Sequence, residues 1–116
     1  MEVAAFGLVL LTVCLAVGQA SCGRRGELLD QAQSASDSGD YSTAAARYEE
    51  FLTENPRHQD AAASRFRLAN LYHYNLKQYE RAIDHYIHVI EEFPNSPDAI
   101  VSRQRLAECY VELGKG

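Results

Sequence analysis

Two histidines on one predicted helix come nearest to a catalytic or metal-binding pattern in this chain. His85 and His88 stand three positions apart, a spacing that could bring both imidazoles to one metal ion. A catalytic zinc ion normally takes three protein ligands, and no third ligand is evident in the sequence around them. A solvated pair on a polar helix face is the simpler interpretation. We therefore expect no metal site.

Other reactive side chains also lack a motif. The acidic pairs Glu49-Glu50 and Glu91-Glu92 fall late in predicted helices, where the helix dipole disfavours them slightly. They are typical of a solvated surface rather than of an acid–base dyad. Serine, histidine and aspartate form no nucleophile motif, and the sequence contains no glycine-rich phosphate loop. We predict no catalytic residue and no cofactor.

Composition narrows the class of protein further. The 116 residues suffice for one domain. A formal net charge of −5 and a pI near 5.3 oppose nucleic-acid binding. The charged fraction of 23% and the hydrophobic fraction of 47% are typical of a folded chain. We therefore expect a single domain whose partners are not nucleic acids.

An apolar run without charge lies near the start of the chain. It covers residues 3–17 (VAAFGLVLLTVCLAV), and the small and polar residues Gly18-Gln19-Ala20-Ser21 follow it. The run is short for a membrane-spanning helix, and its layout is that of a secretory signal peptide, although Met1-Glu2 brings no positive charge. We expect residues 1–21 to be a signal segment. A retained membrane anchor is the alternative.

Cys22 is the predicted lipidation site. Ala20-Ser21-Cys22 resembles the end of a bacterial lipobox, in which the cysteine is acylated and becomes the first residue. This resemblance implies an anchor in the outer membrane facing the periplasm, with residues 22–26 as a short tether. Ordinary signal-peptidase cleavage would instead give a soluble periplasmic or secreted protein. Cys109 is expected to be a small buried hydrophobic residue. If Cys22 is not acylated, a disulfide between Cys22 and Cys109 is a further alternative.

Two stretches of the chain are near copies of each other at an offset of 38 residues. Residues 39–56 align with residues 77–94, and residues 61–72 align with residues 99–110. The matched pairs include Tyr41 with Tyr79, Ala44 with Ala82, Tyr48 with Tyr86, Pro56 with Pro94, Arg67 with Arg105, Leu68 with Leu106, Ala69 with Ala107 and Tyr72 with Tyr110. A fixed period of this size predicts stacked supersecondary units that bury their apolar faces against one another.

The apolar residues recur at helical spacing, and no stretch alternates with the period of a strand. Gly39 and Asn55-Pro56 are typical of helix ends, and Ser96-Pro97-Asp98 is typical of a helix start. The expected helices are Glu27–Ser38, Tyr41–Glu54, Asp60–Leu76, Tyr79–Phe93 and Pro97–Leu113. We therefore predict an all-α repeat domain over residues 27–116.

The segments GDYSTAAARYEEFLTENP, KQYERAIDHYIHVIEEFPNSPDA and RLAECYVELGK resemble tetratricopeptide repeats (TPRs). In that pattern, small residues let two helices approach closely, and an aromatic residue four positions later fills the remaining gap. The resemblance implies an antiparallel helix-pair solenoid of about two and a half repeats, which binds proteins or peptides and is not an enzyme. The unit is longer than the usual length of about 34 residues. In this it resembles repeats of the lipoprotein subunit of the bacterial β-barrel assembly machinery and of the periplasmic partner of the Tol–Pal system.

The repeat pattern also implies a binding groove. In such arrays, the first helix of each repeat lines the concave surface. The predicted groove residues are Phe66, Asn70, His73 and Tyr74 of the middle repeat, Leu29 and Gln33 of the first, and Gln104, Glu108 and Glu112 of the last. Aromatic anchors beside adaptable polar groups suit a peptide or a helix. The alternative is that Phe66 and Tyr74 pack inside.

The last predicted helix is apolar around most of its circumference, whereas arrays normally close with a polar-faced helix. A bare apolar face favours association. We expect Leu106, Tyr110 and Leu113 to form an edge that contacts a partner or a second copy in a homodimer. The alternative explanation of this apolar face is that the sequence is a piece of a longer repeat array.

Overall fold

Every regular element of the described chain is a helix. The computed structural model describes residues 23–115, so the expected signal segment and Cys22 lie outside the described residues. The elements are a helix over residues 23–37, α2 (Tyr41–Glu54), α3 (Ala61–Asn70), its continuation η1 (Leu71–Asn75), α4 (Tyr79–Glu92) and α5 (Pro97–Gly114). The all-α prediction is confirmed.

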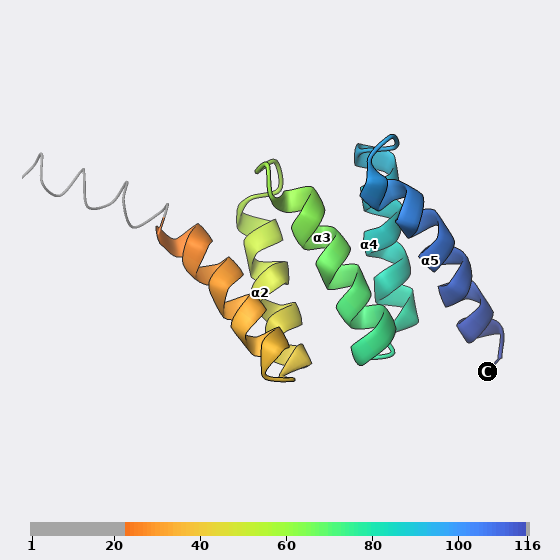
Figure 1. The fold of residues 1–116 in the computed structure, drawn as a ribbon, viewed down its shortest axis with the longest axis horizontal. Coiled ribbons are helices and arrows are strands. Elements are labelled where there is room, and N and C mark those ends of the chain that lie inside the picture. The colour runs from red at the N-terminus through yellow and green to blue at the C-terminus, as the bar shows by residue number, and fades with distance from the viewer. Residues whose placement is uncertain (1–22, 116) are drawn as a thin grey trace, which may run out of the picture.

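Consecutive helices are antiparallel and stand in a row (Figure 1). The helix over residues 23–37, α3 and α5 form one layer, and α2 and α4 lie behind them in this view. Packing follows chain order, with α2 against α3, α3 against α4 and α4 against α5, and α3 also contacts α5 within its own layer. This arrangement is the expected helix-pair solenoid.

Local capping fixes the helix starts. The Asp40 side chain accepts a hydrogen bond from the Thr43 amide, which caps α2. The Ser96 hydroxyl oxygen accepts one from the Ala99 amide at 3.1 Å, and Pro97 occupies the first turn of α5. Each cap satisfies an amide that has no partner within the helix. The predicted start of α5 is confirmed, whereas its end lies at Gly114 rather than Leu113.

One residue of the longer repeat is accommodated by a widened helical turn. In η1 the Leu76 amide donates to the Leu71 carbonyl, a π-type hydrogen bond of 2.9 Å that takes in one extra residue. Lys77 then has a φ of 55°, in the left-handed region. Its repeat equivalent Gly39 has a φ of 85°. Both positions turn the chain back toward the next helix.

Residues 23–26 of the expected tether are helical rather than extended. Arg24 explains part of this difference. Its guanidinium donates to Glu54 at 3.0 Å and to Glu50 at 2.6 Å, both on α2. These exposed ion pairs add little stability individually, but together they hold the first helical turn against the second helix.

Small residues and aromatic rings alternate in the core. The repeat pattern predicts small residues at the helix contacts, and Ala32, Ala69, Ala44 and Ala82 are fully buried there. Ala107, the equivalent residue of α5, is exposed in this structure. The large buried side chains between the helices include Tyr48, Phe51, Leu68, Tyr86 and Val89. Because an alanine leaves room for a ring from the next helix, neighbouring helices come close without leaving a void.

Gly39, in the turn between the first helix and α2, should contribute to stability through its backbone conformation alone. Gly39 has a left-handed φ, and a Cβ placed there would meet no atom within 4 Å. We expect Gly39→Ala to lower the free energy of unfolding by about 1–2 kcal/mol, since an L-residue is strained in this region. Gly26→Ala is the matched control, because Gly26 is helical and equally unobstructed. That change should be neutral or stabilising, by up to about 1 kcal/mol in urea unfolding. Equal effects at both sites would contradict the explanation.

Candidate protein-binding surface

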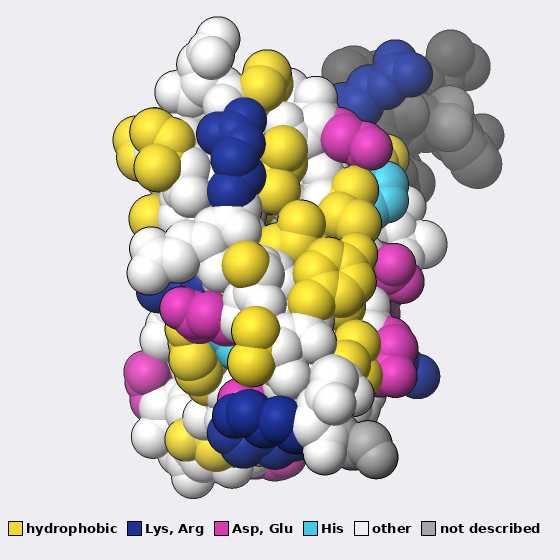
Figure 2. Space-filling view, turned by 90° about the vertical axis from the view of Figure 1, so that its right-hand side faces the viewer, with side chains coloured by type: hydrophobic (Ala, Val, Ile, Leu, Met, Phe, Trp, Pro, Cys, Tyr) yellow, Lys and Arg dark blue, Asp and Glu magenta, His cyan; other side chains and the backbone are white. Residues whose placement is uncertain are grey.

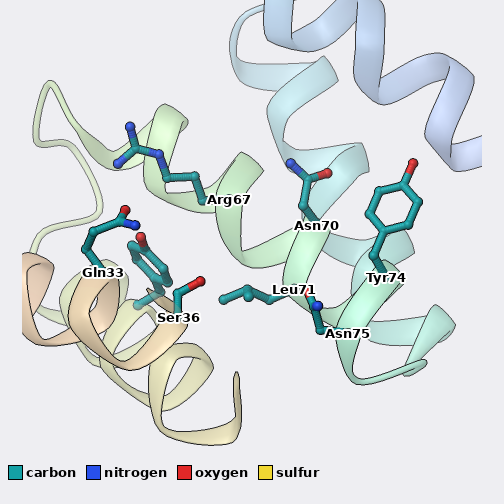
Figure 3. Close-up of a pocket in the computed structure, with 8 residues that line it drawn as sticks. Gln33, Ser36, Arg67, Asn70, Leu71, Tyr74 and Asn75 are labelled. Carbon is teal, nitrogen blue, oxygen red and sulfur yellow. The ribbon is translucent and has the colours of Figure 1, made fainter. Parts of the chain in front are cut away.

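Two hollows lie along the layer formed by the first helix, α3 and α5. One, of about 300 Å³, separates the first helix from α3 and η1 (Figure 3). Its lining residues are Gln33, Ser36, Tyr48, Arg67, Asn70, Leu71, Tyr74 and Asn75. The other, of about 310 Å³, is lined by His73, Tyr74, Lys77, Tyr79, Glu108 and Glu112. Tyr74 borders both hollows, and 45% of its surface is exposed.

Asn70 is the centre of a hydrogen-bond network that joins three helices. Its Oδ1 atom accepts from the Tyr86 hydroxyl of α4 at 2.7 Å and from the Arg105 guanidinium of α5. The Tyr86 hydroxyl also lies 3.2 Å from His73 Nδ1. Asn70, which we predicted to be a groove residue, therefore borders the first hollow while its oxygen is used for internal cohesion.

Sequence reasoning missed Arg105 as a site residue. Its guanidinium lies 5.2 Å from the ring centroid of Phe66 and 5.3 Å from that of Tyr74, so it makes cation–π contacts with both rings. Phe66 also meets the Tyr86 ring at a centroid distance of 6.3 Å and is only partly exposed. The alternative of inward packing therefore describes Phe66, but not Tyr74. The signal was available, since Arg105 repeats Arg67 at the 38-residue offset.

His73 lies at the floor of the second hollow and does not project from the groove. Only 5% of its surface is exposed, and its ring stacks on Tyr74 at 4.0 Å between centroids. The edges of Tyr79 and Tyr86 close it in from α4. Burial lowers the pKa of His73, and the nearby Glu108 carboxylate opposes that shift. The sequence predicted that His73 would be available in the groove for a partner. Its burial shows that this part of the prediction is wrong.

Of the remaining predicted groove residues, Gln33 lines the first hollow and Glu108 and Glu112 line the second, whereas Leu29 and Gln104 line neither. Gln33 is exposed on the first helix and donates to Asp37, and Leu29 packs against the core. Glu108 is exposed on α5 and accepts a hydrogen bond from the Tyr74 hydroxyl at 3.2 Å. Gln104 is exposed and Glu112 partly exposed on the same helix. The groove is therefore aromatic at its centre and polar at its edges.

The two histidines of α4 have different partners. His85 Nε2 lies 3.0 Å from Glu49 Oε1, which also accepts a hydrogen bond from the Tyr72 hydroxyl. His88 instead lies 3.7 Å from a carboxylate oxygen of Glu92. Within residues 23–115, no three histidine, cysteine or acidic side chains are grouped as metal ligands. Burial lowers the pKa of His85, and Glu49 opposes that shift.

Cys109 is a free, fully buried thiol. Burial, with the neighbouring Glu108 and Glu112 carboxylates, raises its pKa to about 11. Because the thiolate is the reactive form, this cysteine is a poor nucleophile at neutral pH. It packs as a small hydrophobic residue on α5.

The family of the chain follows from this architecture and its repeat. The family model Tetratricopeptide repeat matches residues 29–97, and the chain belongs to this family. A comparison with curated proteins found no match. TPRs generally mediate protein–protein interaction and are typically not enzymes. In the described part of the chain, no helix combines the length and the apolar character that crossing a membrane requires.

The buried His73 and the partly buried His85 should make the fold sensitive to acid. Because the pKa of His73 and of His85 is lowered in the folded chain, the unfolded chain takes up more protons as the pH falls through about 6.5. The free energy of unfolding should therefore be highest above that pH and should fall as the pH is lowered below it. Urea unfolding at about pH 7.5 and pH 5, a window above the ordinary carboxyl range, measures the loss.

Histidine-to-glutamine variants identify which side chains cause the loss of stability at low pH. His73→Gln or His85→Gln should reduce the stability lost between the two pH values. His88→Gln, which changes an exposed side chain of the same helix, is the matched control and should leave the loss unchanged. An unfolding free energy that does not change with pH in the parent chain would contradict this explanation.

Proposed function

We propose that this chain is a protein-binding scaffold that holds a segment of its partner in the groove along the first helix, α3 and α5. One observation carries the proposal: two hollows of about 300 and 310 Å³ share a half-exposed tyrosine, Tyr74, as their common wall. A ring held by stacking on His73 and by Arg105 loses little freedom on binding. Rigid aromatic residues of this kind are frequent interface hot spots.

The charges that line the two hollows favour a partner segment with a complementary charge pattern. The first hollow contains Arg67 among amide and hydroxyl side chains and has no carboxylate in its lining. The second contains Glu108 and Glu112, with Lys77 at its rim. A segment with an acidic side chain toward Arg67 and a basic one toward Glu108 would match both ends, which fixes the direction of binding.

A peptide library tests this groove. Peptides selected on the full chain should bind at least about tenfold more weakly to a Tyr74→Ala variant, because the shared wall is lost. Asp84→Ala is the control, since Asp84 is exposed on α4 and lines neither hollow. Titration by fluorescence anisotropy measures both affinities. Selected peptides that bind the Tyr74→Ala variant as tightly as the parent would overturn the proposal.

We further propose that the scaffold is a lipid-anchored protein of the bacterial envelope, acylated on Cys22. The support is the sequence Ala20-Ser21-Cys22 behind an apolar segment, since these residues lie outside the described part of the structure. Gly23, the residue after this cysteine and the first that the structure describes, is already helical. An anchor on Cys22 would then hold the array close to the membrane surface, without a long flexible linker.

Mass spectrometry of the protein made in a bacterial host tests this anchor. We expect an amino terminus at Cys22 that carries acyl chains, and a Cys22→Ser variant that loses them and leaves the membrane fraction. An unmodified amino terminus at Ser21 would instead support ordinary cleavage. Retention of Met1 in a membrane-bound product would support an uncleaved anchor. Either of these results would exclude the lipoprotein assignment.

A further inference from the structure

Two hydrogen-bond donors beside α2 lack the acceptor that their counterparts beside α4 share. At α4 the Tyr86 hydroxyl donates to Asn70 Oδ1 at 2.7 Å, and the Arg105 guanidinium of α5 donates to the same oxygen. The 38-residue offset matches Tyr86 with Tyr48 of α2, and Arg105 with Arg67 of α3. Both of these residues line the first hollow. In the described part of the chain, neither the Tyr48 hydroxyl nor the Arg67 guanidinium makes a hydrogen bond or an ion pair.

No described side chain of the first helix takes the part of Asn70. Ala32, which matches Asn70 at the 38-residue offset, carries no polar group. Gln33 lines the hollow, but its amide donates to Asp37 on its own helix at 2.9 Å. Figure 3 shows the Gln33 and Arg67 side chains at the same end of the hollow, on the two helices that flank it. The two donors therefore face a hollow of about 300 Å³ without a protein acceptor of their own.

The charge of this hollow favours an acidic ligand over a neutral one. Among the residues that line it, Arg67 is the single charged one, and it is exposed. Tyr48 is only 2% exposed, so its ring is held in place by the core and its hydroxyl loses little freedom on binding. A neutral oxygen could accept from both donors, but a carboxylate would also neutralise Arg67. Hydrogen bonds between charged partners are about twice as strong as neutral ones, and a guanidinium can hold a carboxylate by two of them.

We propose that the first hollow is a subsite for an acidic side chain, an aspartate or a glutamate of the partner segment. Its carboxylate accepts from the Tyr48 hydroxyl and the Arg67 guanidinium together, as the Asn70 oxygen accepts from Tyr86 and Arg105. A side chain is the source because the matching oxygen beside α4 also belongs to a side chain. The inference rests on the proposed function, since the segment in the groove supplies the acid, and it adds the pair of donors that recognises this acid.

The first hollow lies between packed helices of the array, unlike the end face at α5. Figure 2 looks at that end and shows hydrophobic side chains gathered there, with charged groups around them. Tyr110, which we expected at this edge, is 55% exposed, whereas Leu106 and Leu113 pack against the core instead. A further helix of the same repeat would pack on this face, so its exposure does not indicate a partner. The lining of the first hollow comes from the first helix, α2, α3 and η1, and so does not depend on what covers α5.

A peptide library with amidated carboxyl ends tests this subsite, because side chains then supply its only carboxylates. Selection on the full chain should yield peptides with one acidic residue whose change to the matching amide weakens binding at least about tenfold in fluorescence anisotropy. An Arg67→Gln chain should bind the acid and amide peptides within about twofold of each other. Arg103→Gln is the matched control, since it removes the same charge from an exposed arginine of α5 that lines neither hollow. This control should keep the preference for the acid.

A Tyr48→Phe chain tests the hydroxyl contact, since it keeps the buried ring. The acidic peptide should bind about 3–10-fold more weakly to this chain than to the parent. A peptide with alanine in place of the acid has no acceptor there and should bind both chains equally. Tyr72→Phe is the matched control, because the Tyr72 hydroxyl donates to Glu49 and does not line the hollow. An equal loss for the acidic and alanine peptides would show a structural effect and would overturn the role of Tyr48.

The remaining outcomes separate this inference from the proposed function. Peptides that need Tyr74 but no acidic residue would support the groove and overturn the acidic subsite. Peptides that need neither would overturn both proposals, and so would a library from which nothing binds. Equal loss of the acid preference in the Arg67→Gln and Arg103→Gln chains would show attraction by net charge, without a specific contact. Arg67-dependent binders found only among peptides with free carboxyl ends would identify a terminal carboxylate, which would overturn the assignment to a side chain.

Discussion

The close approach of neighbouring helices at alanines, with a tyrosine ring filling the space between them, is the constraint on which the rest depends. Tyr86 is fully buried on α4, and so are Ala82 one turn earlier on the same helix and Ala69 on α3. A buried phenol must have hydrogen-bond partners, because an unsatisfied hydroxyl costs about 1–3 kcal/mol. Asn70 and His73 provide them from α3 and η1. The packing of one ring thereby fixes polar side chains on the next helix.

The binding surface is a consequence of that packing. Asn70 and His73 are the hydrogen-bond partners of the Tyr86 hydroxyl. Arg105 donates to the same Asn70 oxygen, and this places its guanidinium against the Phe66 and Tyr74 rings. Tyr74 is left half-exposed on a rigid support, between a hollow that contains Arg67 and one that contains two carboxylates. The aromatic anchor and the charge difference on which partner binding would depend are therefore set by internal contacts rather than by flexible loops.

Repetition also gives the molecule two unlike surfaces. Along the array, side chains from successive first helices form the groove. At α5 the same repeat positions are exposed, so that Tyr110 and Val111 face solvent where Tyr72 and His73 are buried. One set of packing rules thus produces a polar groove with an aromatic centre and an end face with exposed apolar side chains.

The sequence alone determined the helical class, the limits of α2 and the cap at Ser96, because apolar spacing and capping residues act locally. It also indicated which helix of each repeat borders the groove. Only the tertiary structure decided that His73 is enclosed, that Arg105 lies over two rings, and that Leu106 and Leu113 face inward. These outcomes depend on which sector of a helix a neighbour covers. On a helix that is apolar around most of its circumference, the pattern cannot specify that sector until the neighbouring helix is in place.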